Sequence, residues 1–235
     1  SDASPITTTT GKVSIWGKTI SNAGSQHGIE IRNGSSITST SGDITLTGYG
    51  DTAYATSSGI ALYNGATIQS NGNSTITLNA YGLNGIEMNL ATYLIGGASA
   101  TGDILINTDY FKTAVSTNIQ TTGTAYVKPT TASTTIGLGG GTGTLNLDDT
   151  ELGYFNVGKL VIGDSALGTG DIDLDSWNLS AKTHNVEIYG NDIDIGGLTL
   201  GTGNFTAYAK DNGGDLGTLT VSAATTKSLA GTSKL

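Results

Sequence analysis

The sequence predicts an all-β protein folded as a parallel β-helix, or β-solenoid, with almost no α-helix. Three observations predict this fold: a pattern repeats three times, aliphatic residues alternate within each repeat, and helix-favouring stretches are absent. A repeat of a few tens of residues is typical of a solenoid, whose coils bury their apolar stripes only by stacking on one another.

The repeat is clearest over residues 28–110. Its passes are GIEIRNGSSITSTSGDITLTGYG (28–50), GIALYNGATIQSNGNSTITLNAYG (59–82) and GIEMNLATYLIGGASATGDILINTDY (85–110). Each pass holds three short runs in which every second residue is aliphatic, separated by Gly, Asn, Ser and Asp, as in strands broken by turns. The aligned sets are Ile29/Ile31 with Ile60/Leu62 and Ile86/Met88, Ile37 with Ile68 and Ile95, and Ile44/Leu46 with Ile76/Leu78 and Ile104/Ile106. We expect these sets to stack as ladders.

The composition supports strands and excludes some partners. The chain of 235 residues has 36 Gly, 2 Pro, no Cys and 12% charged residues. Thr, Ile and Val favour a pleated surface, and no window is rich in strong helix formers. A formal charge of -9 argues against nucleic acid as a partner. No apolar run approaches the length that spans a bilayer, so we expect no membrane insertion.

Residues 12–226 are expected to form one solenoid, preceded by a frayed or strand-adding lead-in at 1–11. Val13 aligns with Ile44, so a coil is already running near residue 12. The chain start is therefore explained either by removal of a leader or by the chain being a segment of a longer solenoid. We expect the second, since no amphipathic capping element closes the far end.

After the clear coils, the pattern blurs over residues 107–135, where an insertion or loop is expected to leave the helix. A second type of coil is expected over 135–226, and a ragged end over 227–235. The later strand pairs are Val186/Ile188, Ile193/Ile195, Leu198/Leu200, Phe205/Ala207 and Leu219/Val221.

Two stretches carry a resemblance to a known class of proteins. They read KPTTASTTIGLGGGTGTLNLDDTELGYF (128–155) and KLVIGDSALGTGDIDL (159–174). They resemble a repeat of large bacterial surface proteins of the filamentous-haemagglutinin-like class, from which the chain departs at Gly163-Asp164, where a basic residue is expected after the glycine. The resemblance implies a right-handed β-helix, secretion to the bacterial cell surface, often by a two-partner system, and adhesion. The implied partner is a glycan or protein on a host or neighbouring cell.

The acidic residues Asp171, Asp173 and Asp175 alternate with Ile172 and Leu174, and Asp192 and Asp194 repeat the pattern on either side of Ile193. We therefore expect all of these carboxylates on one outward acidic face. The spacing does not fit a helix-loop-helix calcium site or the nonapeptide calcium repeat. We therefore predict no cofactor and no dedicated metal site, with adventitious calcium left open on this face. The glycine-rich GLGGGTG (137–143) precedes a strand rather than a helix, so it predicts a turn and not a phosphate cradle.

Aromatic residues concentrate where the repeat is interrupted, at 49–58 and 107–118. Tyr49, Tyr54, Tyr110 and Phe111 are the candidate binding-surface residues there, together with the three aspartates above. Packing at the ends of ladders explains these aromatic residues equally well.

The sequence therefore predicts a rigid, secreted, adhesive rod, with lateral self-association as a further role, and no catalytic residue. Two alternatives remain. A β-helix enzyme that cleaves polysaccharide is one, because the segment Gln26–Arg32 is similar to a His-Gly motif of pectin-cleaving hydrolases; however, the paired acids Asp148-Asp149 follow His27 instead of preceding it. An ice-binding solenoid is the other, although Thr45/Thr47 and Thr75/Thr77 give only fragments of the regular threonine rows required.

Overall fold

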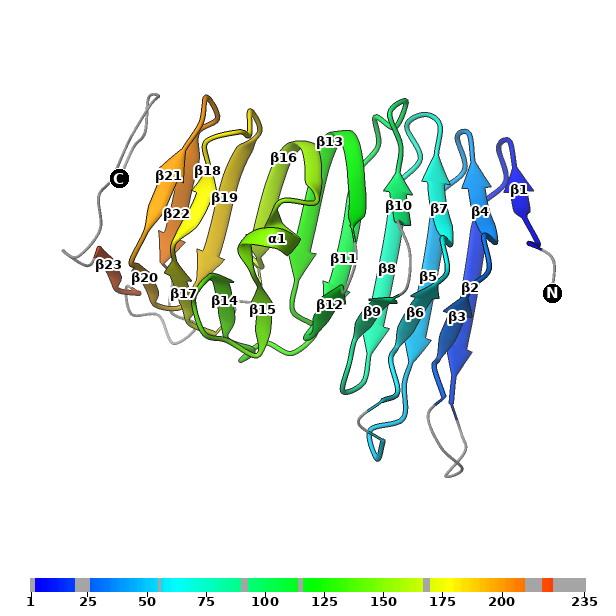
Figure 1. The fold of residues 1–235 in the computed structure, drawn as a ribbon, viewed down its shortest axis with the longest axis horizontal. Coiled ribbons are helices and arrows are strands. Elements are labelled where there is room, and N and C mark those ends of the chain that lie inside the picture. The colour runs from blue at the N-terminus through cyan, green and yellow to red at the C-terminus, as the bar shows by residue number, and fades with distance from the viewer. Residues whose placement is uncertain are drawn as a thin grey trace.

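The computed structural model describes residues 3–19, 26–54, 56–89, 93–113, 116–166, 170–209 and 217–221. It shows a parallel β-helix: the chain winds in coils whose strands pair in parallel with the coils before and after, and the coils stack into an elongated rod (Figure 1). The predicted fold class is confirmed.

Three runs of strands line the rod, and the coils visit them in the same order except that two strands, at residues 136–139 and 145–147, both lie in the first run and follow one another directly. The first run comprises two sheets that follow one another along the rod: β3 (Ile29–Ile31), β6 (Ile60–Tyr63), β9 (Ile86–Asn89) and β12 (Phe111–Thr113), then β15 (Leu145–Leu147), β14 (Ile136–Gly139), β17 (Ile172–Asp175), β20 (Ile193–Ile195) and β23 (Leu219–Val221). The second run comprises β1 (Ile6–Thr8), β4 (Ser36–Ser39), β7 (Thr67–Ser70) and β10 (Tyr93–Gly96), with β18 (Trp177–Leu179) and β21 (Leu198–Leu200) as a separate pair farther on.

The third run is the longest, and it is joined to the second run by β13, which spans both. Its strands are β2 (Val13–Lys18), β5 (Ile44–Tyr49), β8 (Ile76–Tyr81), β11 (Ile104–Thr108), β13 (Thr117–Lys128), β16 (Phe155–Gly163), β19 (Asn185–Gly190) and β22 (Phe205–Ala209). A single short helix, α1 (Asp149–Leu152), is present in the described part of the chain.

The alternation of apolar and polar residues in the sequence corresponds to side chains that point alternately into the core and out of the rod. In β5 and β8 every second side chain is buried, and Leu46 and Leu78 have no exposed surface. The predicted alignments are confirmed: Ile29 pairs with Ile60, Ile37 with Ile68, and Ile44 with Ile76. Stacking at about 4.8 Å places like aliphatic residues over one another and closes a continuous core.

In its described residues, 107–113 and 116–135, the stretch does not leave the solenoid as expected. β12 pairs with β9, with Phe111 opposite Ile86, and β13 pairs with both β10 and β11. The register was hidden because Phe, Ala and Val replace Ile and Leu at the inward positions of these strands. The real discontinuity is narrower, since β12 and β15 belong to different sheets.

At this discontinuity the carboxylate of Glu151 replaces a strand neighbour. Its oxygens accept the backbone N–H of Thr113, at the end of β12, at 3.2 Å and the N–H of Asp148 at 3.1 Å. Asp148 accepts from the Glu151 N–H in return, so α1 begins with a capping box. The helix therefore supplies a hydrogen-bond acceptor where the first run lacks a strand.

The glycine-rich stretch 137–143 is only partly the turn that was predicted, because residues 137–139 belong to β14 and the turn follows them. This turn is unusually short. β14 and β15 are parallel neighbours joined only by residues 140–144, whereas parallel strands normally need a dozen or more residues between them. Gly139, with φ of 65°, starts the reversal. A Cβ on Gly141 would lie 1.9 Å from the carbonyl oxygen of Asp173, so only glycine fits this turn.

The lead-in is ordered where it is described. Residues 6–8 form β1, which pairs with β4 and adds a strand to the second run. The ragged end predicted at 227–235 lies outside the described residues.

Candidate functional site

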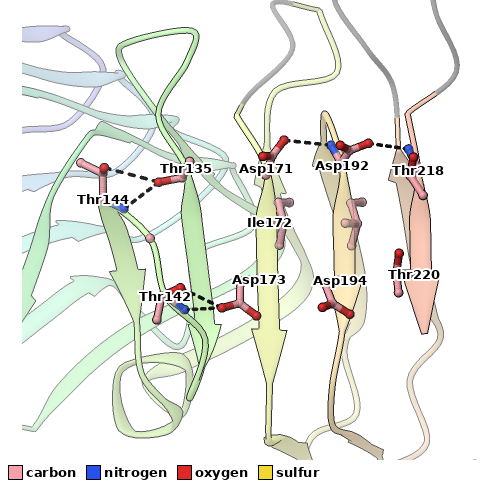
Figure 2. Close-up of a pocket in the computed structure, with 12 residues that line it drawn as sticks. Thr135, Thr142, Thr144, Asp171, Ile172, Asp173, Asp192, Asp194, Thr218 and Thr220 are labelled. Carbon is pink, nitrogen blue, oxygen red and sulfur yellow. Dashed lines mark hydrogen bonds between the residues drawn. The ribbon is translucent and has the colours of Figure 1, made fainter. Parts of the chain in front are cut away.

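An acidic groove lies on the outer face of the first run, over β14, β17, β20 and β23 (Figure 2). Ile172 and Leu174 point into the core, so the side chains between and beside them point outward. In register, Asp173 lies beside Asp194, and Asp194 lies beside Thr220. The groove is open and has a volume of about 750 Å³. Its threonine lining is Thr135, Thr142, Thr144, Thr218 and Thr220.

Two of the groove carboxylates have a structural task. Asp171 accepts the backbone N–H of Asp192 at 3.2 Å and the side-chain amide of Asn191 at 2.9 Å. Asp192 accepts the N–H of Thr218 at 2.6 Å. Each carboxylate thus holds the corner of the next coil.

The same contact recurs near the other end of the rod. Asp43 accepts the N–H of Thr75 at 3.1 Å, and Asp103 accepts the N–H of Thr124 at 2.9 Å. All of these aspartates immediately precede a strand. We call this contact the aspartate corner clamp.

The remaining groove carboxylates, Asp173 and Asp194, differ in the hydrogen bonds that they accept. Asp173 accepts from the backbone N–H of Thr142 at 2.8 Å and from its hydroxyl at 2.9 Å, both seen in Figure 2. In the part of the chain that the structure describes, Asp194 forms no hydrogen bond or ion pair. Asp194 is therefore the carboxylate best placed to receive a donor from a ligand.

The predicted outward aspartates divide between groove and rim. Asp171 and Asp173 line the groove, whereas Asp175, exposed at the end of β17, does not. No group of three or more acidic or histidine side chains in the described ranges is arranged to hold a metal ion.

The predicted aromatic residues do not form one surface. Phe111 is only 4% exposed and belongs to the core, so the expectation that it lies on an exposed loop is wrong. Its burial follows from its position in β12, where it takes the place that Ile86 has in β9. Tyr110, immediately before it, is exposed, and Tyr54 is half-buried.

Tyr49 is on the outer face of β5 and stacks on Tyr81 of the next coil. Their ring centroids are 4.6 Å apart with an interplanar angle of 8°. A ring face covered by another ring is less free to receive a flat ligand. Tyr49 therefore contributes to the ladder packing that the sequence left as its alternative role.

A polar cluster that sequence reasoning missed surrounds Glu87 on β9. The carboxylate of Glu87 is almost buried, with 7% of the residue exposed. It accepts from the hydroxyl of Ser58 at 2.8 Å, the hydroxyl of Tyr63 at 3.3 Å and the ammonium of Lys112 at 3.3 Å. Burial and the adjacent Glu87 charge raise the pKa of Tyr63 to about 12, so its hydroxyl stays a donor at neutral pH.

His27 completes the cluster. Its Nδ1 accepts the backbone N–H of Ser58 at 3.1 Å, so the neutral ring carries its proton on Nε2, 3.2 Å from the Tyr63 hydroxyl. Both ring nitrogens are thus engaged. The acid linked to His27 through Tyr63 is Glu87.

Glu87 had a weak sequence signal. It stands between the inward residues Ile86 and Met88, and the equivalent residue in the preceding coil is Ala61, so alternation alone would place Glu87 on the outer face. The burial comes from Ser58 and Tyr63, which belong to the neighbouring coil. The sequence pattern alone could not show that these side chains lie over it.

A buried histidine gives the protein a defined response to acid. His184, between β18 and β19, is 6% exposed, and its Nε2 has no hydrogen-bond partner among the described residues. Burial, reinforced by the positive charge of Lys182, lowers the pKa of His184 from 6.5 to about 4. As pH falls through 6.5, the unfolded chain gains a proton that the folded chain refuses, so folding loses stability until about pH 4.

Replacing His184 by leucine is expected to remove this loss. The free energy of unfolding of the variant should rise relative to the parent by about 3 kcal/mol between pH 6.5 and pH 4, measured by urea unfolding. Burial raises the pKa of Glu151 from 4.5 to about 7, which acts in the opposite sense because the folded chain holds that proton more tightly. Glu151 is present in both proteins, so its contribution cancels in the difference between their free energies of unfolding. If the two free energies ran parallel from pH 6.5 to pH 4, His184 would not titrate as described.

In the described residues, no helix is long and apolar enough to cross a membrane. Comparisons with protein families, with curated proteins and with solved structures found no match for this chain.

Proposed function

We propose that this chain is a rigid adhesive segment of a secreted bacterial surface protein, which attaches to a glycan or protein on a neighbouring or host cell. The observation that carries the proposal is the alignment of outer side chains between neighbouring coils, which lets them contact one another. Thr47, Asn79 and Asn107 illustrate it, because the Asn79 amide donates to Thr47 at 3.1 Å and the Asn107 amide donates to Asn79 at 2.7 Å. A surface of aligned polar rows suits attachment to an extended partner.

The acidic groove is the part of this surface that we assign to the ligand. It offers carboxylates and threonine hydroxyls along a shallow, open channel. A carboxylate such as Asp194 accepts hydrogen bonds from the hydroxyl groups of a sugar, and hydrogen bonds to charged groups are among the stronger ones. A neutral glycan is therefore the ligand class that the groove chemistry favours.

Replacing Asp194 by asparagine tests this assignment. Binding to the glycan selected by the parent protein on a glycan array should weaken about tenfold to a hundredfold, because one charge-assisted hydrogen bond is lost. Glu30→Gln is the matched control, since it removes the same charge from an exposed site outside the groove. Unchanged affinity in Asp194→Asn would contradict the role of the groove.

The proposal as a whole has a separate test. Parent protein that binds neither glycans nor cultured cells would contradict adhesion, and turnover of pectin or alginate would favour the alternative of a polysaccharide-cleaving enzyme. Inhibition of ice recrystallisation would favour the ice-binding alternative.

A further inference from the structure

The acidic groove is closed at one end by the turn between β14 and β15. Because these strands are parallel, residues 140–144 must return along β14 before β15 can begin. They return over its outer face, since a Cβ on the outward Gly137 would lie 2.6 Å from the carbonyl oxygen of Gly141. Gly137 is therefore buried, whereas Asp173 and Asp194, its counterparts in β17 and β20, are not. We call residues 140–144 the ridge.

Hydrogen bonds hold the ridge on both of its sides. The side-chain amide of Asn146 in β15 donates to the carbonyl oxygen of Gly141 at 2.9 Å. On the groove side, the N–H and the hydroxyl of Thr142 both donate to the carboxylate of Asp173 in β17. The ridge is thus fastened to the strands that flank β14, and it stands across the groove as a fixed end wall.

Beyond the ridge, two rows of outward side chains run along the rod and form the floor of the groove. One row is Asp171, Asp192 and Thr218, and the other is Asp173, Asp194 and Thr220. Neighbours within a row are one coil apart, about 4.8 Å, and the two rows are two residues apart along the strands, about 7 Å. Figure 2 shows both rows, with Thr142 and Thr144 of the ridge on the side of β17 that faces away from β20.

A linear glycan in an extended conformation fits this spacing. Each pyranose unit advances such a chain by a length close to one coil step, so one unit lies over each of β17, β20 and β23. The two rows then flank the chain and face the hydroxyl groups on its two edges. Carboxylates accept hydrogen bonds from these hydroxyls, and threonine hydroxyls both donate and accept them.

Such a chain cannot continue past β17, because the ridge occupies the space over β14 that the next unit would need. The unit over β17 is then the last of the chain, and it lies against Thr142 and Asp173. We infer that the groove recognises the end of a linear glycan, which lies along the rod with its terminal sugar against the ridge. This inference rests on the proposed adhesive function, and it narrows the ligand from any neutral glycan to one with a free terminus.

The number of proteins bound to each glycan chain tests the inference. The probe is the glycan that the parent protein selects on a glycan array, prepared as single units, as oligomers of two to six units and as long polymer. Isothermal titration calorimetry should give one bound protein per chain at every length, because each chain has one end of the required kind. Affinity should rise about threefold to tenfold with each unit from one to three. Several proteins on one long chain would overturn the inference.

Blocked chain ends provide a second measurement on the same glycan. A methyl group is placed on the reducing end of the trimer in one sample and on the terminal hydroxyl of the other end in a second sample. One of the two modifications should weaken binding about tenfold or more, because the ridge leaves no space for the added group, and the other should have no effect. Equal affinity for both modified trimers and the unmodified one is the result that rules out end recognition.

Variants of the floor show whether the sugar units are counted from the ridge. Thr220→Ala removes an exposed hydroxyl of β23, so it should weaken binding of the trimer about threefold to tenfold and leave the affinity for the dimer unchanged. Asp194→Asn, on β20, should weaken binding of the dimer and the trimer alike. Thr77→Ala, on the outer face of β8, is the matched control and should change neither affinity. An equal effect of Thr220→Ala on dimer and trimer would contradict this register.

The outcomes separate this inference from the function on which it rests. A parent protein that binds no glycan contradicts the adhesive function and end recognition together. Binding of several proteins to one polymer chain, or binding that is insensitive to both blocked ends, overturns end recognition alone. Circular dichroism checks that each variant is folded.

Discussion

Replacing Trp177 by alanine is expected to lower the free energy of unfolding by about 3–5 kcal/mol. Trp177 opens β18, is only 2% exposed, and meets the ring of Phe205 edge-on with centroids 6.5 Å apart. Truncation would leave a cavity beneath β21, whose Leu198 pairs with Trp177. The large cost follows because neighbouring coils, fixed by their strand pairing, cannot collapse into that space.

Urea unfolding followed by circular dichroism measures this effect, with Trp16→Ala as the matched control. The same substitution at Trp16 removes a side chain that is 65% exposed and should cost under about 1 kcal/mol. Since coils of a solenoid contact mainly their neighbours, the Trp177 variant should melt first in its last coils. Equal losses in the two variants would contradict the burial of Trp177.

Replacing Gly141 by alanine is expected to cost about 2–3 kcal/mol or to displace the turn between β14 and β15. The added Cβ would meet the carbonyl oxygen of Asp173 at 1.9 Å and its carbonyl carbon at 2.6 Å. Both atoms belong to the backbone of β17, which is paired on both sides and cannot withdraw without breaking hydrogen bonds.

The neighbouring Gly140→Ala is the control for this prediction. The nearest atoms to its added Cβ are side-chain oxygens of Ser176 and Asp175, at 2.9 and 3.3 Å, which can move aside. Thermal unfolding should therefore show a clearly lower melting temperature for Gly141→Ala than for Gly140→Ala. The reverse order would show that the turn is not held against β17.

The fold could be predicted from the sequence because each clear coil repeats nearly the same alternation of apolar residues. The core positions of stacked residues such as Ile44, Ile76 and Ile104 can be predicted from their spacing alone. Prediction failed where inward residues changed type, as at Phe111. An aromatic residue in an interrupted repeat has the same sequence signature whether it fills a core or covers a loop.

The candidate site was only partly readable for a different reason. Alternation identified Asp173 and Asp194 as outward residues, but it could not show that they are neighbours, because that depends on coil-to-coil register. The cluster around Glu87 was not found because it joins side chains from consecutive coils. Contacts across coils depend on turn geometry, and turn lengths vary along this chain.

The aspartate corner clamp has a consequence for how the number of coils in such a chain can change during evolution. Asp43, Asp103, Asp171 and Asp192 each precede a strand and fasten the next coil at a corner, although the intervening segments differ in length. We expect that a duplicated or deleted stretch that keeps this carboxylate would preserve the hydrogen bond to the next coil. Coils could then be added or removed, and the length of the rod changed, without altering the apolar residues of the core.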